Sequence, residues 1–336
     1  MGTAKAAGIV VGVLVALLLT TDLVLRGAFP HFLRLTDNFS SMYLHREVAS
    51  VARDPSAIVF LGDSALWGYR VSADAAAVTE LRAEGCDCRN LSFEGGSPVN
   101  TYAMLRLLTA SGSKPKLVVF NVNQKEFNPA DSAYQTIHPS VETLAWPLLT
   151  AEERAPLTAH PPHDWNGVVD AAVSRWWALY GLRSDMREAL FGDVDAVHAV
   201  QSFIEDRTGA RARAAQQHTA TAERFEGTYD LTPLAGESDN VSVAFLRRVG
   251  QLARAQHLHM VALLTPTNHT LLHDYIDTPA YAGNLSYTKR LLQGYGIVVV
   301  DLDRAIPADE FLDNDHLTQA GNRRLAAILR PALATQ

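Results

Sequence analysis

The sequence predicts an α/β protein built around a parallel sheet of about five strands. Three observations favour this fold class. Short apolar runs without polar alternation recur along the chain, helical stretches separate most of them, and polar residues follow directly where the runs end. Strands that are apolar throughout are typical of a parallel sheet covered by helices on both faces. Ligands of such sheets bind beyond the carboxyl ends of the strands, so a functional site is expected there.

Composition limits the kinds of protein that this chain can be. It has 336 residues, of which 48% are hydrophobic and 19% charged, and this balance excludes a disordered or fibrous protein. The formal net charge of −7 argues against a nucleic-acid partner, which needs a basic face. Two cysteines are too few for a zinc module built on four, and we expect no metal or other cofactor.

Five short runs form the predicted strands, and four of them are mostly apolar. The first, Ala-Ile-Val-Phe-Leu, ends just before Gly62, and the third, Lys-Leu-Val-Val-Phe-Asn, ends at Asn121. These four do not show the period-two alternation of a strand with one solvent-exposed face, whereas the second run is mixed. The predicted strands cover residues 57–61, 89–93, 116–121, 259–264 and 297–302.

Helical stretches separate most of these strands and follow the last one. The predicted helices cover residues 74–84, 99–110, 241–256, 281–294 and 318–330. Strands that alternate with helices indicate a parallel sheet, because each crossover between parallel strands needs a long connection.

The segment from residue 125 to residue 238 interrupts this rhythm. It is too long for a plain crossover, so we expect an insertion or cap with helices of its own. Two helices are predicted there, over residues 170–182 and 193–204. Residues 55–336 are therefore interpreted as one domain that carries this insertion.

The N-terminus contains an apolar run over residues 6–25, in which Asp22 is the only charge. About 20 helical residues at ~1.5 Å each span a ~30 Å hydrocarbon core. No convincing cleavage site follows, so a retained anchor within residues 1–26 is favoured over a cleaved signal peptide. Residues 27–54 form a connector with some helix. We expect the main body to be periplasmic or extracellular, although the distribution of Lys and Arg does not fix the orientation.

Cys86 and Cys88 are separated by a single residue. A disulfide across that spacing would be strained. The sequence therefore predicts two free thiols in a turn.

Ser64 directly follows the first predicted strand, as the last residue of Gly62-Asp63-Ser64. Its hydroxyl would lie at the carboxyl edge of the sheet and can act as a nucleophile if a base lies nearby. Serine is also a common helix N-cap, and the motif alone does not separate the two roles. The Gly-x-Ser-x-Gly elbow of α/β-hydrolases is absent, because Leu66 stands at the second glycine position.

A candidate base for Ser64 lies near the other end of the chain. Asp313 and His316 are three residues apart in a loop before the last predicted helix. The carboxylate can hold one imidazole nitrogen while the other faces the serine, which is the arrangement of acyl-transfer enzymes. Asp315 competes with Asp313 for the orienting role, and the three-residue spacing favours Asp313.

Two other strand ends supply donors for an oxyanion. Gly95 follows the second predicted strand, where a glycine lets a backbone N–H approach a developing alkoxide, and Gly96 is the alternative. Asn123 follows the third strand, and Asn121 projects to the same side of an extended chain. Each such donor stabilises a transition state by roughly 3–4 kcal/mol.

In chain order, these four elements resemble the GDSL, or SGNH, hydrolase family. The matching residues are Gly62-Asp63-Ser64, Gly95, Asn123, Asp313 and His316. The resemblance covers about residues 57–124 and 240–333. Ala65 interrupts the name-giving tetrapeptide, and Val122 and Gln124 flank the asparagine where the family often has glycine and aspartate.

The resemblance implies a flavodoxin-like three-layer α/β/α fold and a role for each residue. Ser64 would be the nucleophile, His316 the general base and Asp313 its orienter. The N–H groups of Ser64 and Gly95 and the side chain of Asn123 would form the oxyanion hole.

Several polar neighbours are candidate substrate-binding residues. They are Asp63, Gly96, Asn121, Asn268 and His269. His269 also stands four residues before His273, a spacing that can bind zinc on a helix. No glutamate completes a metalloprotease pattern, so a metal site is not expected.

The predicted function is hydrolysis of acyl esters, such as short O-acyl groups on small molecules or on envelope glycans. The same residues would serve a polysaccharide O-acyltransferase that works with a membrane-bound O-acyltransferase as its acyl donor. A non-catalytic glycan-binding protein of the envelope is the second alternative.

Overall fold

The computed structural model describes only part of the chain. The described residues are 12–24, 41–69, 71, 75–157, 173, 177, 180, 226–229, 231–234 and 240–334. The chain divides into two compact units, of which the first comprises Met1–Tyr43 and Pro162–Gln217 and the second comprises Leu44–Pro161 and His218–Gln336. The second unit contains the sheet and the candidate site.

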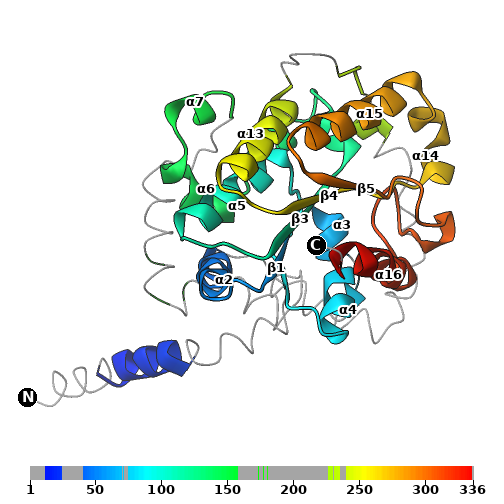
Figure 1. Ribbon diagram of the computed structural model, residues 1–336. Helices are drawn as coiled ribbons and strands as arrows, with labels where there is room; N and C mark the ends of the chain where they lie inside the picture. Colours follow the sequence, from blue (N-terminus) through cyan, green and yellow to red (C-terminus); the bar gives the residue numbers. More distant parts are fainter. Residues whose placement is uncertain are drawn as a thin grey trace, which may run out of the picture. The chain divides into compact units, whose positions relative to one another are not determined.

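The second unit is built on a parallel sheet of five strands, as the sequence predicts (Figure 1). The strands are β1 (Ile58–Leu61), β2 (Cys88–Asn90), β3 (Leu117–Val122), β4 (Met260–Leu264) and β5 (Val298–Asp301). Their order is β2-β1-β3-β4-β5, which is the flavodoxin-like order implied by the family resemblance.

The middle of the sheet is buried on both faces. Every residue of β1, β3 and β4 is buried, whereas β5 is an edge strand with partly exposed residues. β2 is shorter than predicted, because residues 91–93 are irregular. Buried central strands explain why their sequences are apolar throughout.

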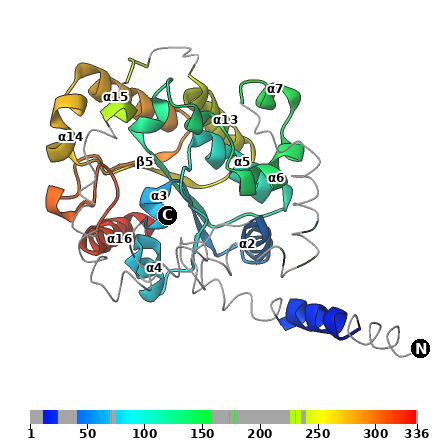
Figure 2. The same cartoon turned by 180° about the vertical axis from the view of Figure 1, so that it is seen from behind.

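Helices cover both faces of the sheet (Figures 1 and 2). α4 (Ala77–Ala83) and α16 (Gln319–Ala334) pack on one face, where they share a hydrophobic cluster with β1, β3 and β4. α5 (Pro98–Ala110), α13 (Val241–Ala255) and α15 (Pro279–Gly294) lie on the other face. The second unit therefore has the three layers that the resemblance implies.

The sequence marks where these helices begin. The Ser97 side chain accepts a hydrogen bond from the Asn100 N–H at the start of α5, and Pro98 follows the cap. Thr278 and Pro279 play the same parts for α15. These local signals explain why the predicted and observed helices agree closely.

Ten further helices are labelled in the described part of the second unit and at its boundary. They are α2 (Ser41–Arg53), α3 (Ser64–Trp67), η2 (Gln124–Phe127), η3 (Ser132–Gln135), α6 (Pro139–Ala145), η4 (Trp146–Leu148), α7 (Ala151–Arg154), η7 (Glu226–Tyr229), α14 (His269–Ile276) and η8 (Ala308–Glu310). α2 falls within the connector predicted at 27–54, and several others fall within the predicted insertion. The insertion helices predicted over 170–182 and 193–204 lie, apart from three isolated positions, outside the described residues.

The described part of the predicted anchor is helical over residues 12–24. In the described ranges, no helix combines the length and the apolar character that crossing a membrane requires.

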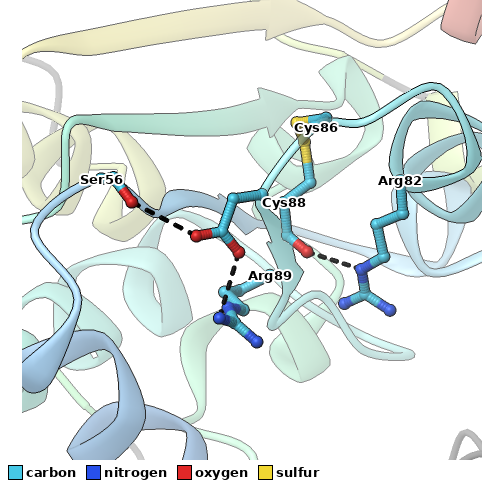
Figure 3. Close-up of a disulfide and its surroundings, with 6 residues drawn as sticks. Ser56, Arg82, Cys86, Cys88 and Arg89 are labelled. Atoms are coloured by element: carbon cyan, nitrogen blue, oxygen red, sulfur yellow. Dashed lines mark hydrogen bonds and ion pairs between the residues drawn. A yellow bond between two sulfur atoms is a disulfide. The ribbon is translucent and has the colours of Figure 1, made fainter.

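The prediction of two free thiols is wrong, because Cys86 and Cys88 form a disulfide (Figure 3). Their Cα atoms are 5.2 Å apart, inside the usual range for a bridge. The turn before β2 brings the two residues together, and Arg82 donates from Nε to the Cys88 carbonyl at 2.5 Å. The bridge lies at the start of β2, and the candidate site lies beyond the opposite end of the sheet's strands.

Candidate active site

The candidate site lies between β1 and β3. From β1 the chain adds β2 on one side of the sheet, and β3, β4 and β5 follow on the other side. The carboxyl ends of β1 and β3 are neighbours, because Leu61 pairs with Phe120 in the parallel ladder. In an open α/β sheet this switch point is where ligands bind. The predicted site residues that follow β1 and β3 are therefore adjacent in space.

The turn after β1 fixes the position of Ser64. Gly62 has a φ of +146°, and a Cβ atom there would lie 1.8 Å from Asn121 Oδ1, so only glycine fits. Asp63 then caps α3, its Oδ1 accepting from the Ala65 N–H at 2.9 Å. Ser64 is the first residue of α3. The predicted alternative, in which Ser64 itself is the cap, is wrong because Asp63 has that role.

A chain of hydrogen bonds joins Ser64, His316 and Asp313. Ser64 Oγ lies 2.8 Å from His316 Nε2, and His316 Nδ1 lies 2.8 Å from Asp313 Oδ2. Because an ionised carboxylate can only accept, Nδ1 carries the hydrogen and Nε2 is left to accept from the serine hydroxyl. All three residues are buried. The structure thus brings together three groups predicted from opposite ends of the sequence.

The charges around His316 favour its protonated form. Burial acts to lower its pKa, but the hydrogen bond to Asp313 and the charge of Asp315 hold the pKa of His316 above its ordinary value. Burial likewise acts to raise the pKa of Asp313, but its hydrogen bonds with His316 hold that pKa below the ordinary value. This combination suits an imidazole that accepts a proton beside a carboxylate that stays ionised.

The loop that carries Asp313 and His316 is braced from both sides. The Leu312 N–H donates to the His316 carbonyl at 2.7 Å, and Asp313 Oδ1 accepts from the His316 N–H at 3.0 Å. Asn268, the N-cap of α14, donates from Nδ2 to the Asp313 carbonyl at 3.2 Å. Asn268 was predicted as a candidate substrate contact, and its side chain is committed to the loop and to α14.

Asn121 and Asn123 both reach Asp63, but they differ in what surrounds them. Asn121 Nδ2 donates to Asp63 Oδ1 at 2.6 Å and to Thr265 Oγ1 at 2.8 Å, while its Oδ1 accepts from the Asp63 N–H at 3.0 Å. Asn121 therefore ties β1, β3 and β4 together. Asn123 Nδ2 donates to Asp63 Oδ2 at 3.2 Å and to Asp315 Oδ2.

The two glycines after β2 also differ. Gly95 has a φ of +74° and is exposed, and its N–H donates to no described residue. The Ser64 N–H is equally unused within the described part of the chain. Gly96 is buried, and a Cβ there would lie 2.1 Å from the Gly62 carbonyl oxygen. Gly96 thus allows close packing against the turn of Ser64, whereas Gly95 offers a free donor.

His269 was predicted as a candidate substrate contact, but it is part of a separate buried cluster. Its Nε2 lies 2.9 Å from Asp303 Oδ2, and Tyr281 donates from its hydroxyl to Asp303 Oδ1 at 2.5 Å. His273 does lie on the same helix, α14, but it pairs with Asp274 at 2.9 Å and is exposed.

Sequence reasoning missed two neighbours of the site. Lys125 forms a buried ion pair with Asp315, which in turn bonds Asn123. The ring of Tyr69 packs at 4.5 Å, between centroids, against the ring of His316. Lys125 follows Asn123 by only two residues, and Tyr69 follows Ser64 by five. This closeness in sequence to predicted site residues is the signal that could have identified them.

Comparisons with known proteins find solved structures that align at low sequence identity and low TM-score. No protein-family model matches the sequence, and no curated protein matches it either. A lipolytic protein of the G-D-S-L family from Veillonella parvula aligns over 84% of this chain and 100% of its own, with 10% identity and a TM-score of 0.41. A GDSL-like lipase from Bacteroides thetaiotaomicron aligns over 87% and 97%, with 10% identity and a TM-score of 0.37.

A third solved structure is an active-site mutant of a family two carbohydrate esterase from Clostridium thermocellum in complex with celluohexase. It aligns over 83% of this chain and 64% of its own, with 10% identity and a TM-score of 0.32.

Proposed function

We propose that this chain is a serine-dependent acyl-ester hydrolase of the GDSL, or SGNH, type. One observation carries the proposal: Ser64 Oγ, His316 and Asp313 form an unbroken chain of hydrogen bonds of 2.8 Å each at the switch point of the sheet. A nucleophile, a base within hydrogen-bond reach and a third group that orients the base are the requirements of acyl transfer.

The reaction would proceed through an acyl-enzyme. Ser64 Oγ attacks the ester carbonyl carbon while His316 Nε2 takes its proton. The C–O bond to the leaving alcohol then breaks, and His316 returns the proton to that alcohol. A water molecule attacks the acyl-serine with His316 again as base, which releases a carboxylic acid and restores the serine.

Three donors are proposed for the oxyanion. The N–H groups of Ser64 and Gly95 have no acceptor among the described residues, and the Asn123 amide nitrogen faces the same end of the sheet. The two backbone N–H groups are already in place, so they can stabilise the negative charge as it develops without reorganisation.

We propose short O-acyl esters, on small molecules or envelope glycans, as the substrate class. Transfer of the acyl group to a sugar hydroxyl, with a membrane-bound O-acyltransferase as donor partner, uses the same residues with a different nucleophile in the second step. Incubation with an acetyl donor and candidate oligosaccharides, followed by mass analysis of both products, separates transfer from hydrolysis.

We also propose that residues 6–25 anchor the protein in a membrane, with the catalytic unit on the periplasmic or extracellular side. The apolar composition of this run supports the proposal, together with the exposed leucines of its described helical part, such as Leu17 and Leu23. Membrane fractions washed with alkaline carbonate should retain the full chain and release a variant that lacks residues 1–26.

The experiment that tests the proposed function is turnover of a chromogenic acetyl ester by Ser64→Ala. We expect a loss of about 10³-fold or more, because Ser64 is the hydroxyl that lies beside His316 and that forms the acyl-enzyme in the proposed reaction. Ser92→Ala is the matched control, since Ser92 is also a buried serine after a strand of the same sheet, and its hydroxyl has no partner among the described residues. Equal activity in the two variants would contradict the proposal, and glycan binding that survives His316→Ala without any turnover would favour a non-catalytic protein.

A further inference from the structure

The hydrogen bonds of Asn123 limit what its amide can do. Its Nδ2 donates to Asp63 Oδ2 at 3.2 Å and to Asp315 Oδ2. A carboxamide nitrogen carries two hydrogens, so both are committed within the protein. To donate to an oxyanion on the substrate, Asn123 must release one of these two carboxylates.

Asp315 is the carboxylate that can be released at the lower cost. The oxygen that accepts from Asn123, Asp315 Oδ2, also pairs with Lys125 Nζ and so keeps a partner after release. Asp63 Oδ2 has no other donor than Asn123 within the described part of the chain, and it would be left unpaired and buried. An unpaired buried carboxylate oxygen is costly.

Lys125 is built to stay charged in this position. Burial acts to lower its pKa, but the charge of Asp315, with smaller effects from Tyr134 and Asp63, holds the pKa of Lys125 above its ordinary value. Burial and the charge of Asp63 raise the pKa of the neighbouring Glu126 well above the ordinary value, which favours its neutral form. Lys125 is therefore a cation that pairs with the same Asp315 oxygen that accepts from the Asn123 amide.

We propose that Lys125 is a positioning residue that frees the amide of Asn123 for the oxyanion. In the resting state, Asp315 and Asp63 accept from the amide and thereby turn its nitrogen, rather than its oxygen, toward the site. As the oxyanion forms, one N–H of Asn123 moves from Asp315 Oδ2 to the substrate oxygen, and Lys125 keeps Asp315 paired. No covalent bond changes in this exchange, and no proton leaves its nitrogen. The inference rests on the proposed function of the site.

The exchange takes place only when the oxyanion develops, so it affects the transition state and not substrate binding. Removing Lys125 should therefore lower kcat and leave KM nearly unchanged. We expect Lys125→Met to lower kcat about 10- to 100-fold, because among the described residues Asp315 Oδ2 then has no partner to replace Asn123. The matched control is Lys289→Met. It removes a lysine of α15 that pairs with Asp301 of β5 near the surface, and it should leave kcat unchanged.

Two double variants show whether Lys125 acts through its neighbours. With Asp315→Asn, the carboxylate charge that needs the lysine is gone, so adding Lys125→Met should cost less than about threefold in kcat. With Asn123→Ala, the amide that Lys125 frees is gone, and adding Lys125→Met should again cost little. If Lys125→Met does not fold, the double variant with Asp315→Asn, which leaves no unpaired charge, decides the question alone.

The outcomes separate this inference from the proposed function. Losses that multiply in both double variants, or a change in KM with an unchanged kcat, would overturn the role of Lys125 while Ser64→Ala remains inactive. Full turnover by Ser64→Ala would overturn the proposed function and this inference together. Melting temperatures of all variants, measured alongside, exclude a loss of kcat through unfolding.

Discussion

Two carboxylates flank one imidazole in this site, and they act on it in different ways. Asp313 accepts the Nδ1 hydrogen of His316 at 2.8 Å and sets its orientation. Asp315 Oδ1 lies 3.6 Å from the same nitrogen and contributes through its charge. Both charges stabilise the imidazolium that forms when Ser64 loses its proton.

The charge of Asp315 should be visible in the pH dependence of the reaction. His316 acts as a base only when neutral, so kcat/KM rises with pH through its pKa in the free enzyme. This pKa is raised, so we expect the acid limb above the ordinary histidine range. Asp315→Asn removes a negative charge that stabilises the imidazolium, which lowers the pKa of His316 and moves the limb to lower pH. A limb that stays in place or moves upward would contradict this assignment.

The two asparagines after β3 should respond differently to substitution. Asn123→Ala removes a proposed oxyanion donor and should lower kcat about 10²- to 10³-fold. Because it also leaves the buried Asp63 Oδ2 without its described donor, it should lower the free energy of unfolding as well. Asn121→Ala breaks three buried hydrogen bonds between strand ends and should lower the free energy of unfolding by about 1–3 kcal/mol. Kinetics and urea denaturation of both variants check the assignment. A larger loss of kcat in Asn121→Ala than in Asn123→Ala would exchange their roles.

Sequence reasoning identified the three residues of the proposed triad but not the residues that contact them. Ser64, Asp313 and His316 are recognisable because their spacing from strand and helix ends is a local property. The contact between Lys125 and Asp315 depends on how two loops meet, and no local pattern encodes it. The choice between Asn121 and Asn123 also needed the hydrogen bonds of the folded chain.

At the scale of elements, the agreement between sequence and structure follows from burial. β1, β3 and β4 are buried along their whole length, so their sequences are apolar throughout and easy to recognise. β2 has only three residues, and residues 91–93 after it are buried although they do not belong to the strand. Hydrophobicity therefore could not show where the strand ends. The disulfide was missed because spacing in sequence does not report the distance that a turn creates.

The loop after β2 offers a test at this scale. A Cβ on Gly96 would lie 2.1 Å from the Gly62 carbonyl oxygen and 2.8 Å from the Asp63 nitrogen, both backbone atoms. Gly96→Ala should therefore displace the turn of Ser64, lower the free energy of unfolding by about 1–3 kcal/mol and reduce kcat.

Gly283→Ala on α15 is the control for that substitution. Its Cβ would meet nothing within 4 Å, and it lies inside a helix, so the variant should be more stable by about 0.5–1 kcal/mol. Thermal unfolding and ester turnover of both variants distinguish the two cases. A Gly96→Ala protein with unchanged stability and activity would show that the turn does not need this close approach.

At the scale of the whole molecule, the site depends on strand order. Ser64 and His316 are 252 residues apart in sequence, and they meet because β1 lies inside the sheet while the loop before α16 returns to its carboxyl edge. Hydrophobic patterns predict parallel strands but not their order, which the structure supplies. The insertion has no comparable pattern, and most of it lies outside the described residues.

The most direct test of the triad is covalent labelling with a fluorophosphonate, followed by intact-mass and peptide analysis. We expect one adduct per chain, on the peptide that contains Ser64, with no adduct in Ser64→Ala and much slower labelling in His316→Ala. A folded wild-type protein that takes up no label, or takes it up at another residue, would contradict the assignment of Ser64 as the nucleophile.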